Sequence, residues 1–214
     1  MSVILDDKAQ RGAYWPLPIA RAIPAAVTAI VITFSADHSA RFGLVAFGTF
    51  AVTSGVLVAV VAGRRLGASG VRPYLVAQGL VSCALGVVAV VTTSGGVAAF
   101  FVVVASWAAI TGALELYSGL RTRGRFAASG DWLTAGAITA VAALAFVLLP
   151  PDFRQEFVGD ERVSGILDSS IVGVGLLGAY TAIIAVFLVI AGLSARWGTT
   201  RTDAAASVTT RGDR

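Results

Sequence analysis

The chain has 214 residues, of which 57% are hydrophobic and only 13% are charged. Soluble domains carry roughly 25% charged residues, so this composition excludes an ordinary water-exposed globule. The net charge of +4 comes from short basic clusters scattered between apolar runs, without an aromatic-studded basic face, which excludes a nucleic-acid-binding surface.

Six apolar stretches follow along the chain, each long enough to cross a bilayer, for which about 20 helical residues suffice. They predict helices at 16–35, 42–62, 73–92, 96–118, 132–150 and 170–194. The continuous runs of Ala, Leu and Val disfavour a β-barrel, whose strands alternate in polarity. A cleaved signal peptide at the N-terminus is disfavoured, because Asp6 and Asp7 weaken its basic region and the apolar run is long.

The predicted fold is an all-α polytopic membrane protein with three parts. Residues 1–15 form a cytoplasmic N-terminal segment, and residues 16–195 form a six-helix transmembrane domain. The tail 196–214 is rich in Thr, Ala, Arg and Asp, a composition that predicts a disordered cytoplasmic segment.

Basic residues predict the orientation, because they collect on the cytoplasmic side of a membrane. Three of them, Arg41, Arg154 and Arg162, fall in the loops after the first and fifth helices. The others lie before the first helix or near its start, after the even-numbered helices and in the tail: Lys8, Arg11, Arg21, Arg64, Arg65, Arg72, Arg121, Arg123, Arg125, Arg196, Arg201, Arg211 and Arg214. Both termini are therefore predicted to be cytoplasmic.

The chain also carries an internal repeat. Residues 107–123 and 180–196 place an aromatic residue, a Gly-Leu pair and an arginine at matching offsets. A period of about 60 residues predicts three repeated helical hairpins in the same orientation.

Two runs resemble the HdeD-like acid-resistance membrane protein family, built from short repeats of paired transmembrane helices. They are Trp107…Gly112…Glu115…Gly119-Leu120-x-x-Arg123 and Trp132…Gly136…Pro150. The resemblance covers most of the chain, although the first helix has Pro18 and Pro24 and no glycine, and the loop 151–169 is long. It implies a bacterial inner-membrane protein linked to acid or envelope stress, and it implies no catalytic residue.

Small residues recur every seven positions on four of the predicted helices. Seven residues are nearly two turns, so each set marks one helix face, and small residues let helices in lipid approach closely. We interpret these faces as helix–helix contacts: Gly48 and Gly55, Gly79 and Gly86, Gly112 and Gly119, and Gly178, Ala185 and Gly192.

Glu115 is interpreted as the only ionisable residue well inside an apolar stretch, where a charge is costly and is usually buried or functional. It shares the small-residue face of its helix, which Thr111 and Ser118 flank, and Gln78 and Ser82 are its expected polar partners. Two interpretations stay open. Glu115 either pairs with a snorkelling arginine and locks two helices, or acts as a proton- or cation-responsive group in a polar seam. The arginines considered are Arg72, Arg121 and Arg123.

The loop 151–169 holds five acidic and two basic residues, typical of a solvated loop. Phe153, Phe157 and Val163 alternate with its charges, so part of it is predicted to be a short amphipathic interfacial helix. Its spacing matches no EF-hand, so no metal is assigned. His38 is expected on the same side of the membrane and is interpreted as incidental.

Known catalytic signatures do not support an enzyme. The match Gly173-x-Gly175-x-x-Gly178 to the dinucleotide fingerprint lies inside an apolar stretch with no strand before it, so we assign no cofactor. A single cysteine, Cys83, and a single histidine exclude an intramolecular disulfide and a multi-histidine metal site within one chain.

The predicted function is therefore a non-enzymatic bacterial inner-membrane protein of HdeD-like type in acid or envelope stress tolerance. One alternative is a small-solute or proton transporter or channel that uses Glu115, and another is an accessory subunit of another membrane protein. Expected partners are membrane lipids, and a second copy or another membrane protein, but no nucleic acid.

Overall fold

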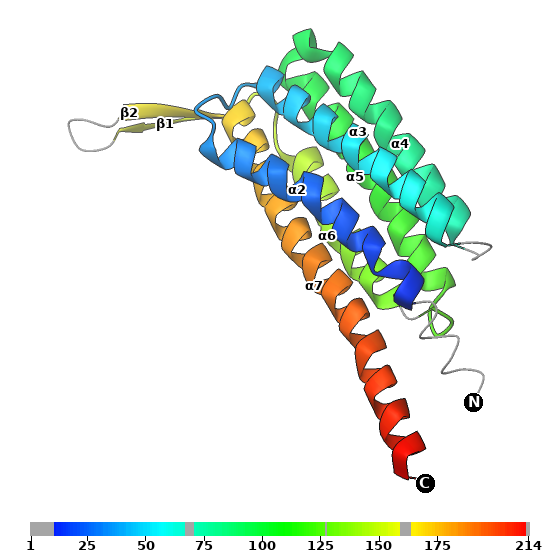
Figure 1. The fold of residues 1–214 in the computed structure, drawn as a ribbon. Coiled ribbons are helices and arrows are strands. Elements are labelled where there is room, and N and C mark those ends of the chain that lie inside the picture. Colours follow the sequence, from blue (N-terminus) through cyan, green and yellow to red (C-terminus); the bar gives the residue numbers. More distant parts are fainter. Residues whose placement is uncertain (1–10, 67–70, 127, 159–163, 213–214) are drawn as a thin grey trace.

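The computed structural model describes residues 11–66, 71–126, 128–158 and 164–212. Six long helices pack side by side in one bundle (Figure 1). They are α2 (Pro16–Phe34), α3 (Ala40–Arg65), α4 (Arg72–Val91), α5 (Gly96–Arg121), α6 (Ser129–Leu148) and α7 (Ser169–Gly212). Each is long and apolar enough to cross a membrane, which confirms the predicted six-helix, multi-pass membrane protein.

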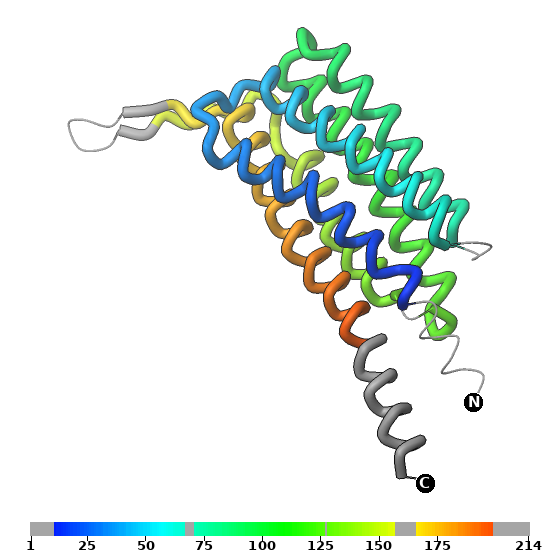
Figure 2. Tube along the Cα trace, in the orientation of Figure 1, coloured from blue at the N-terminus to red at the C-terminus, as the bar shows by residue number. Residues whose placement is uncertain are grey.

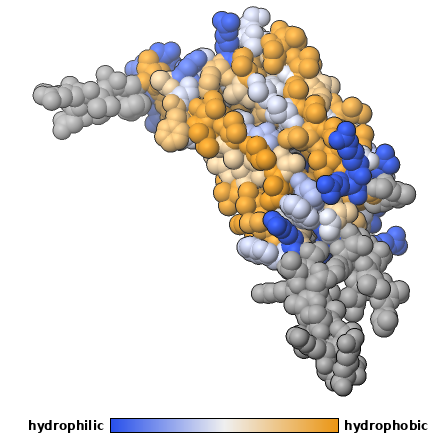
Figure 3. Space-filling model, in the orientation of Figure 1, coloured by the Kyte–Doolittle hydropathy of each residue, from blue (hydrophilic) through white to orange (hydrophobic). Residues whose placement is uncertain are grey.

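The bundle has two chemically different ends. The start of α2 and the coloured C-terminal part of α7 lie at one end, and the 35–39 connection and a β-hairpin lie at the other (Figure 2). We call the first the basic end, because Arg11, Arg65, Arg72 and Arg121 lie there, and the second the hairpin end. Apolar residues cover most of the visible face between them, as expected for a surface in contact with lipid (Figure 3).

Local sequence sets several helix boundaries. The Ser39 side chain accepts from the backbone N–H of Phe42 and caps α3. Pro73 lies in the first turn of α4, where the missing N–H leaves no helical bond unmade. Gly96, which follows the short 3-10 helix η1 (Thr93–Gly95) and is the first residue of α5, has φ +64°, a conformation that favours glycine.

The predicted glycine faces lie where helices approach most closely. On α3 and α4, a Cβ atom built on Gly55 would lie 2.5 Å from the Gly79 carbonyl oxygen, and one on Gly48 would lie 2.8 Å from that of Gly86. Cys83 packs at the same contact, with Sγ 3.7 Å from the Val52 carbonyl oxygen. The two backbones are therefore nearly in contact.

The other predicted glycines lie at two further helix pairs. On α5 and α6, a Cβ on Gly112 would lie 3.2 Å from the Ala140 nitrogen, and one on Gly119 would lie 2.7 Å from Leu133 Cγ. On α7 and α2, a Cβ on Gly178 or Gly192 would meet Ile32 or Ile19. Close packing of small residues thus joins α3 to α4, α5 to α6, and α7 to α2.

The segment predicted to be an interfacial helix is instead a β-hairpin, so that prediction was wrong. Strand β1 (Arg154–Val158) pairs antiparallel with β2 (Ser164–Asp168), and Arg154 lies opposite Asp168. Opposite charges in directly facing positions stabilise a strand pair, which the helical interpretation overlooked. Asp160, Glu161, Arg162 and Val163 lie outside the described residues.

Helix α7 is assigned to Gly212, and the disorder of the segment 196–214 stays a prediction. Extending an existing helix costs far less than starting a new one, because the nucleus is already formed. The transmembrane part of α7 supplies that nucleus, and the run Ala204-Ala205-Ala206 has high helix propensity.

Asp168 caps the start of α7 at the hairpin end. Its Oδ1 accepts from the Ser170 hydroxyl at 2.6 Å and from the Ile171 backbone N–H at 3.0 Å. The hydrogen bond from the Ser170 hydroxyl, together with those from the backbone N–H groups of Ile171 and Ser170, lowers the pKa of the Asp168 carboxyl below its ordinary value.

Asp168→Ala is expected to lower the free energy of unfolding by about 1 kcal/mol at neutral pH, the usual value of such a cap, and Asp168→Asn by much less. Because the folded-state pKa is lowered, the carboxylate stabilises the fold above the unfolded pKa. That contribution is lost as the pH falls through the folded pKa. Denaturation in detergent at several pH values measures both effects, and an equal loss for the two variants would contradict the cap.

Candidate functional site

Three helices bring a charged pair and an amide together inside the bundle. Glu115 on α5 is 1% exposed, Arg21 on α2 is 9% exposed and Gln78 on α4 is 4% exposed. Arg21 Nη2 donates to Glu115 Oε1 in an ion pair, and Gln78 Nε2 donates to the same oxygen at 2.6 Å. We call these three residues the Arg21–Glu115–Gln78 cluster.

The partner of Glu115 corrects the sequence analysis in two respects. Arg21 lies inside the first span and is buried, so Glu115 is not the only charged residue within a span. The arginines predicted to reach Glu115 are instead exposed, and one of them, Arg121, donates to the hydroxyl of Tyr117. A charge five residues into a span is equally compatible with a basic flank and with a buried partner, which is why sequence reasoning missed Arg21.

The predicted polar seam divides into two groups. Gln78 contacts Glu115 as expected, whereas Ser82 accepts from the Trp107 indole N–H at 3.0 Å. The hydroxyls of Thr111 and Ser118 donate within their own helix, to the carbonyl oxygens of Trp107 and Leu114, each at 2.7 Å. Of these four residues, Gln78 is therefore the one whose described side-chain hydrogen bond reaches Glu115.

The cluster leaves acceptor capacity unused. Among the described residues, no donor reaches the buried oxygens Glu115 Oε2 and Gln78 Oε1. An unpaired buried acceptor destabilises a structure, and removing one member of a buried ion pair is more costly than replacing both. The cluster therefore joins α2, α4 and α5, and replacing one member of the ion pair is expected to destabilise the fold more than replacing both.

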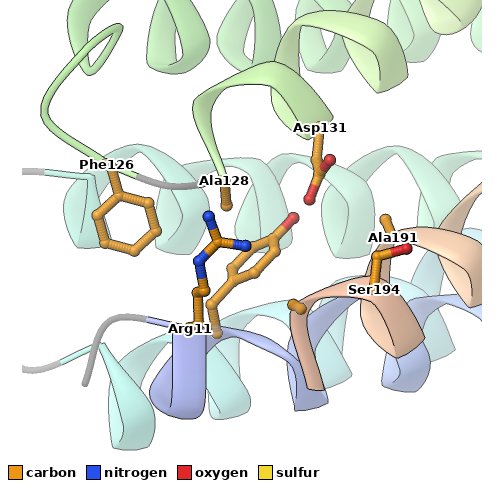
Figure 4. A pocket seen from close by; sticks show the side chains of 8 residues that line it. Arg11, Phe126, Ala128, Asp131, Ala191 and Ser194 are labelled. Atoms are coloured by element: carbon orange, nitrogen blue, oxygen red, sulfur yellow. The ribbon is translucent and has the colours of Figure 1, made fainter. Parts of the chain in front are cut away.

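A small cavity of about 90 Å³ lies at the basic end of the bundle. Figure 4 shows Arg11, Phe126, Asp131 and Ser194 around it. Tyr14, which also lines the cavity, forms a side-chain hydrogen bond with Asp131 and interacts electrostatically with Arg21 and Glu115. Polar groups therefore extend from the basic end towards the middle of the bundle. Sequence reasoning missed Tyr14 and Asp131, because each lies at the edge of an apolar stretch.

Aromatic side chains surround the inner end of these polar groups. The Trp107 ring lies 5.4 Å from Phe47, 5.6 Å from Phe50 and 5.8 Å from Tyr180, measured between centroids. The hydroxyl of Tyr180 is hydrogen-bonded to that of Thr139 at 3.1 Å. Edge-to-face packing of this kind fills space without leaving polar atoms unpaired.

Three phenylalanines fill the bundle between this aromatic group and the hairpin end. Phe100, Phe101 and Phe146 are at most 4% exposed, and their ring centroids lie 5.7–5.8 Å apart. An apolar layer without charged groups is a barrier to ions, because a charge moved into it loses its hydration. Among the described residues, these three buried rings add no polar atom between the aromatic group and the hairpin end.

Comparisons of the chain with protein-family models, with curated proteins and with solved structures found no match. Within the described part of the chain, no three His, Cys, Asp or Glu side chains gather in a way that could hold a metal ion.

Proposed function

We propose that this chain is a non-enzymatic, multi-pass protein of the bacterial inner membrane, of HdeD-like type, that contributes to acid or envelope stress tolerance. The observation that carries the non-transporting part is the phenylalanine layer of Phe100, Phe101 and Phe146 beyond a Glu115 already paired with Arg21. The stress role is supported by the resemblance of residues 107–123 and 132–150 to that family.

Both termini are proposed to be cytoplasmic. The start of α2 and the C-terminal part of α7 lie at the same end of the bundle, as six crossings require (Figure 1). The helix bounds place Arg65, Arg72 and Arg121 at this end as well. Cytoplasmic retention of basic loops supports this orientation.

A three-hairpin repeat is also part of the proposal. Its support is the recurrence of one packing device, since glycine contacts join three helix pairs: α3–α4, α5–α6 and α7–α2. Repeated units that bury their small-residue faces against one another are typical of such architectures.

The function test combines survival and flux. We expect deletion of the gene to lower survival of the source bacterium in acid, and the wild-type chain to restore it. Purified protein in liposomes with a pH gradient is expected to leave proton uptake at the level of protein-free liposomes. Collapse of the gradient by the wild-type protein would contradict the non-transporting proposal.

A second candidate, a proton transporter using Glu115, is favoured by one observation. The cavity lined by Arg11, Tyr14 and Asp131 places polar groups between the basic end and the Arg21–Glu115–Gln78 cluster. Asp131→Asn separates the two functions, because it changes this route without altering the cluster. Under the transporter proposal it should abolish flux, whereas Asp37→Asn, at an exposed site near the hairpin end, should not.

A further inference from the structure

A fixed arginine lies on the outer surface between α4 and α5 at the basic end. The rings of Tyr74 and Tyr117 meet edge to face, with centroids 5.1 Å apart. The Arg121 guanidinium carbon lies 5.8 Å from the Tyr74 ring centroid and 5.9 Å from that of Tyr117. Arg121 Nη1 also donates to the Tyr117 hydroxyl at 2.9 Å. Two cation–π contacts and one hydrogen bond therefore hold an exposed side chain in place.

This group faces lipid at the depth of the headgroups. Ile110, Tyr117 and Arg121 are spaced by seven and four residues, so they share one face of α5. Ile110 and Tyr117 are 44% and 46% exposed, which identifies that face as the lipid-facing one. Arg121 is the last residue of α5 and Tyr74 the third of α4, and tyrosines at such positions mark the membrane–water interface.

The chemistry of the group suits a phosphate. A guanidinium has five N–H donors in a planar fork that matches phosphate oxygens, and the Tyr117 hydroxyl accepts from one of its nitrogens. Arg72, Arg123 and Arg125 lie exposed at the same end and add positive potential. Clusters of basic residues beside a transmembrane helix attract anionic lipids.

We propose that Tyr74, Tyr117 and Arg121 form a binding site for the phosphate of an anionic phospholipid headgroup. A lipid is the source because Tyr117, which holds the arginine, shares the exposed face of α5 with Ile110, where the acyl chain of a bound lipid would lie. The site is independent of the Arg21–Glu115–Gln78 cluster and of the proposed stress function.

Native mass spectrometry of the full chain, titrated with phosphatidylglycerol and with phosphatidylcholine, tests the site. The wild type should retain phosphatidylglycerol preferentially. Arg121→Gln should weaken that retention about tenfold or more, since it removes the charge-assisted hydrogen bonds to the phosphate. The matched control Arg123→Gln removes one exposed charge at the same end, and should weaken retention severalfold at most.

A charge-neutral variant makes the test specific. Tyr117→Leu should also weaken phosphatidylglycerol retention, because it releases Arg121 from the ring and the hydroxyl while leaving the net charge unchanged. Equal effects of Arg121→Gln and Arg123→Gln, or full retention by Tyr117→Leu, would overturn the proposal. Displacement of the lipid by millimolar inorganic phosphate would overturn the assignment to a lipid, since a soluble anion would then suffice.

Discussion

Arg21→Met is expected to lower the free energy of unfolding by about 3–5 kcal/mol, the usual penalty for removing one partner of a buried ion pair. The substitution leaves the carboxylate of Glu115, 1% exposed, with the Gln78 amide as its described partner. Methionine fills a similar length of side chain, so the loss reflects the uncompensated charge more than a cavity. Denaturation in mixed micelles, followed by circular dichroism, measures this loss.

The combined variant Arg21→Met with Glu115→Gln separates charge from packing. It is expected to recover most of the lost stability, because neutral replacement of a buried ion pair is often close to neutral. An amide oxygen at position 115 can still accept from Gln78 Nε2. Arg41→Met, at an exposed arginine in the first turn of α3, is the matched control and should change stability by no more than about 0.5 kcal/mol. If Arg21→Met alone lowered the free energy of unfolding no more than Arg41→Met does, the ion pair would contribute little to stability.

The architecture of this chain was largely predictable, because lipid restricts the choice of fold. Backbone groups that cannot bond to lipid must bond within helices, so apolar runs of sufficient length become spans. The ends of the helices follow turn and basic residues within a few positions, as for α5, which ends at Arg121 beside the predicted end at residue 118. The glycines spaced seven residues apart likewise predicted which helix faces approach another helix.

Which helices become neighbours was not predictable from the sequence. A glycine face indicates a contact without naming its partner, and α2 packs against α7, the element farthest from it in the chain. For the same reason Glu115 was identified, whereas its partner Arg21, 94 residues away, was not. The hairpin of β1 and β2 was missed because a short alternation of charged and apolar residues fits either a strand or an interfacial helix.

Gly55→Ala is the second substitution expected to have a large effect. The added Cβ would lie 2.5 Å from the Gly79 carbonyl oxygen, 2.8 Å from Cys83 Sγ and 3.0 Å from the Cys83 backbone nitrogen. Two of these atoms belong to the α4 backbone, which cannot turn aside as a flexible side chain can. Helices α3 and α4 must therefore separate, and overpacking of this kind usually costs about 1–3 kcal/mol.

Gly175→Ala supplies the matched control, because it adds the same methyl group inside α7, where no atom lies within 4 Å. Alanine has the higher helix propensity, so this variant should be neutral or more stable by up to about 1 kcal/mol. In the same denaturation assay, Gly55→Ala is therefore expected to destabilise the protein and Gly175→Ala is not. If Gly55→Ala is as harmless as Gly175→Ala, α3 and α4 do not approach through their glycines, and van der Waals contact between their backbones does not hold this pair together in lipid.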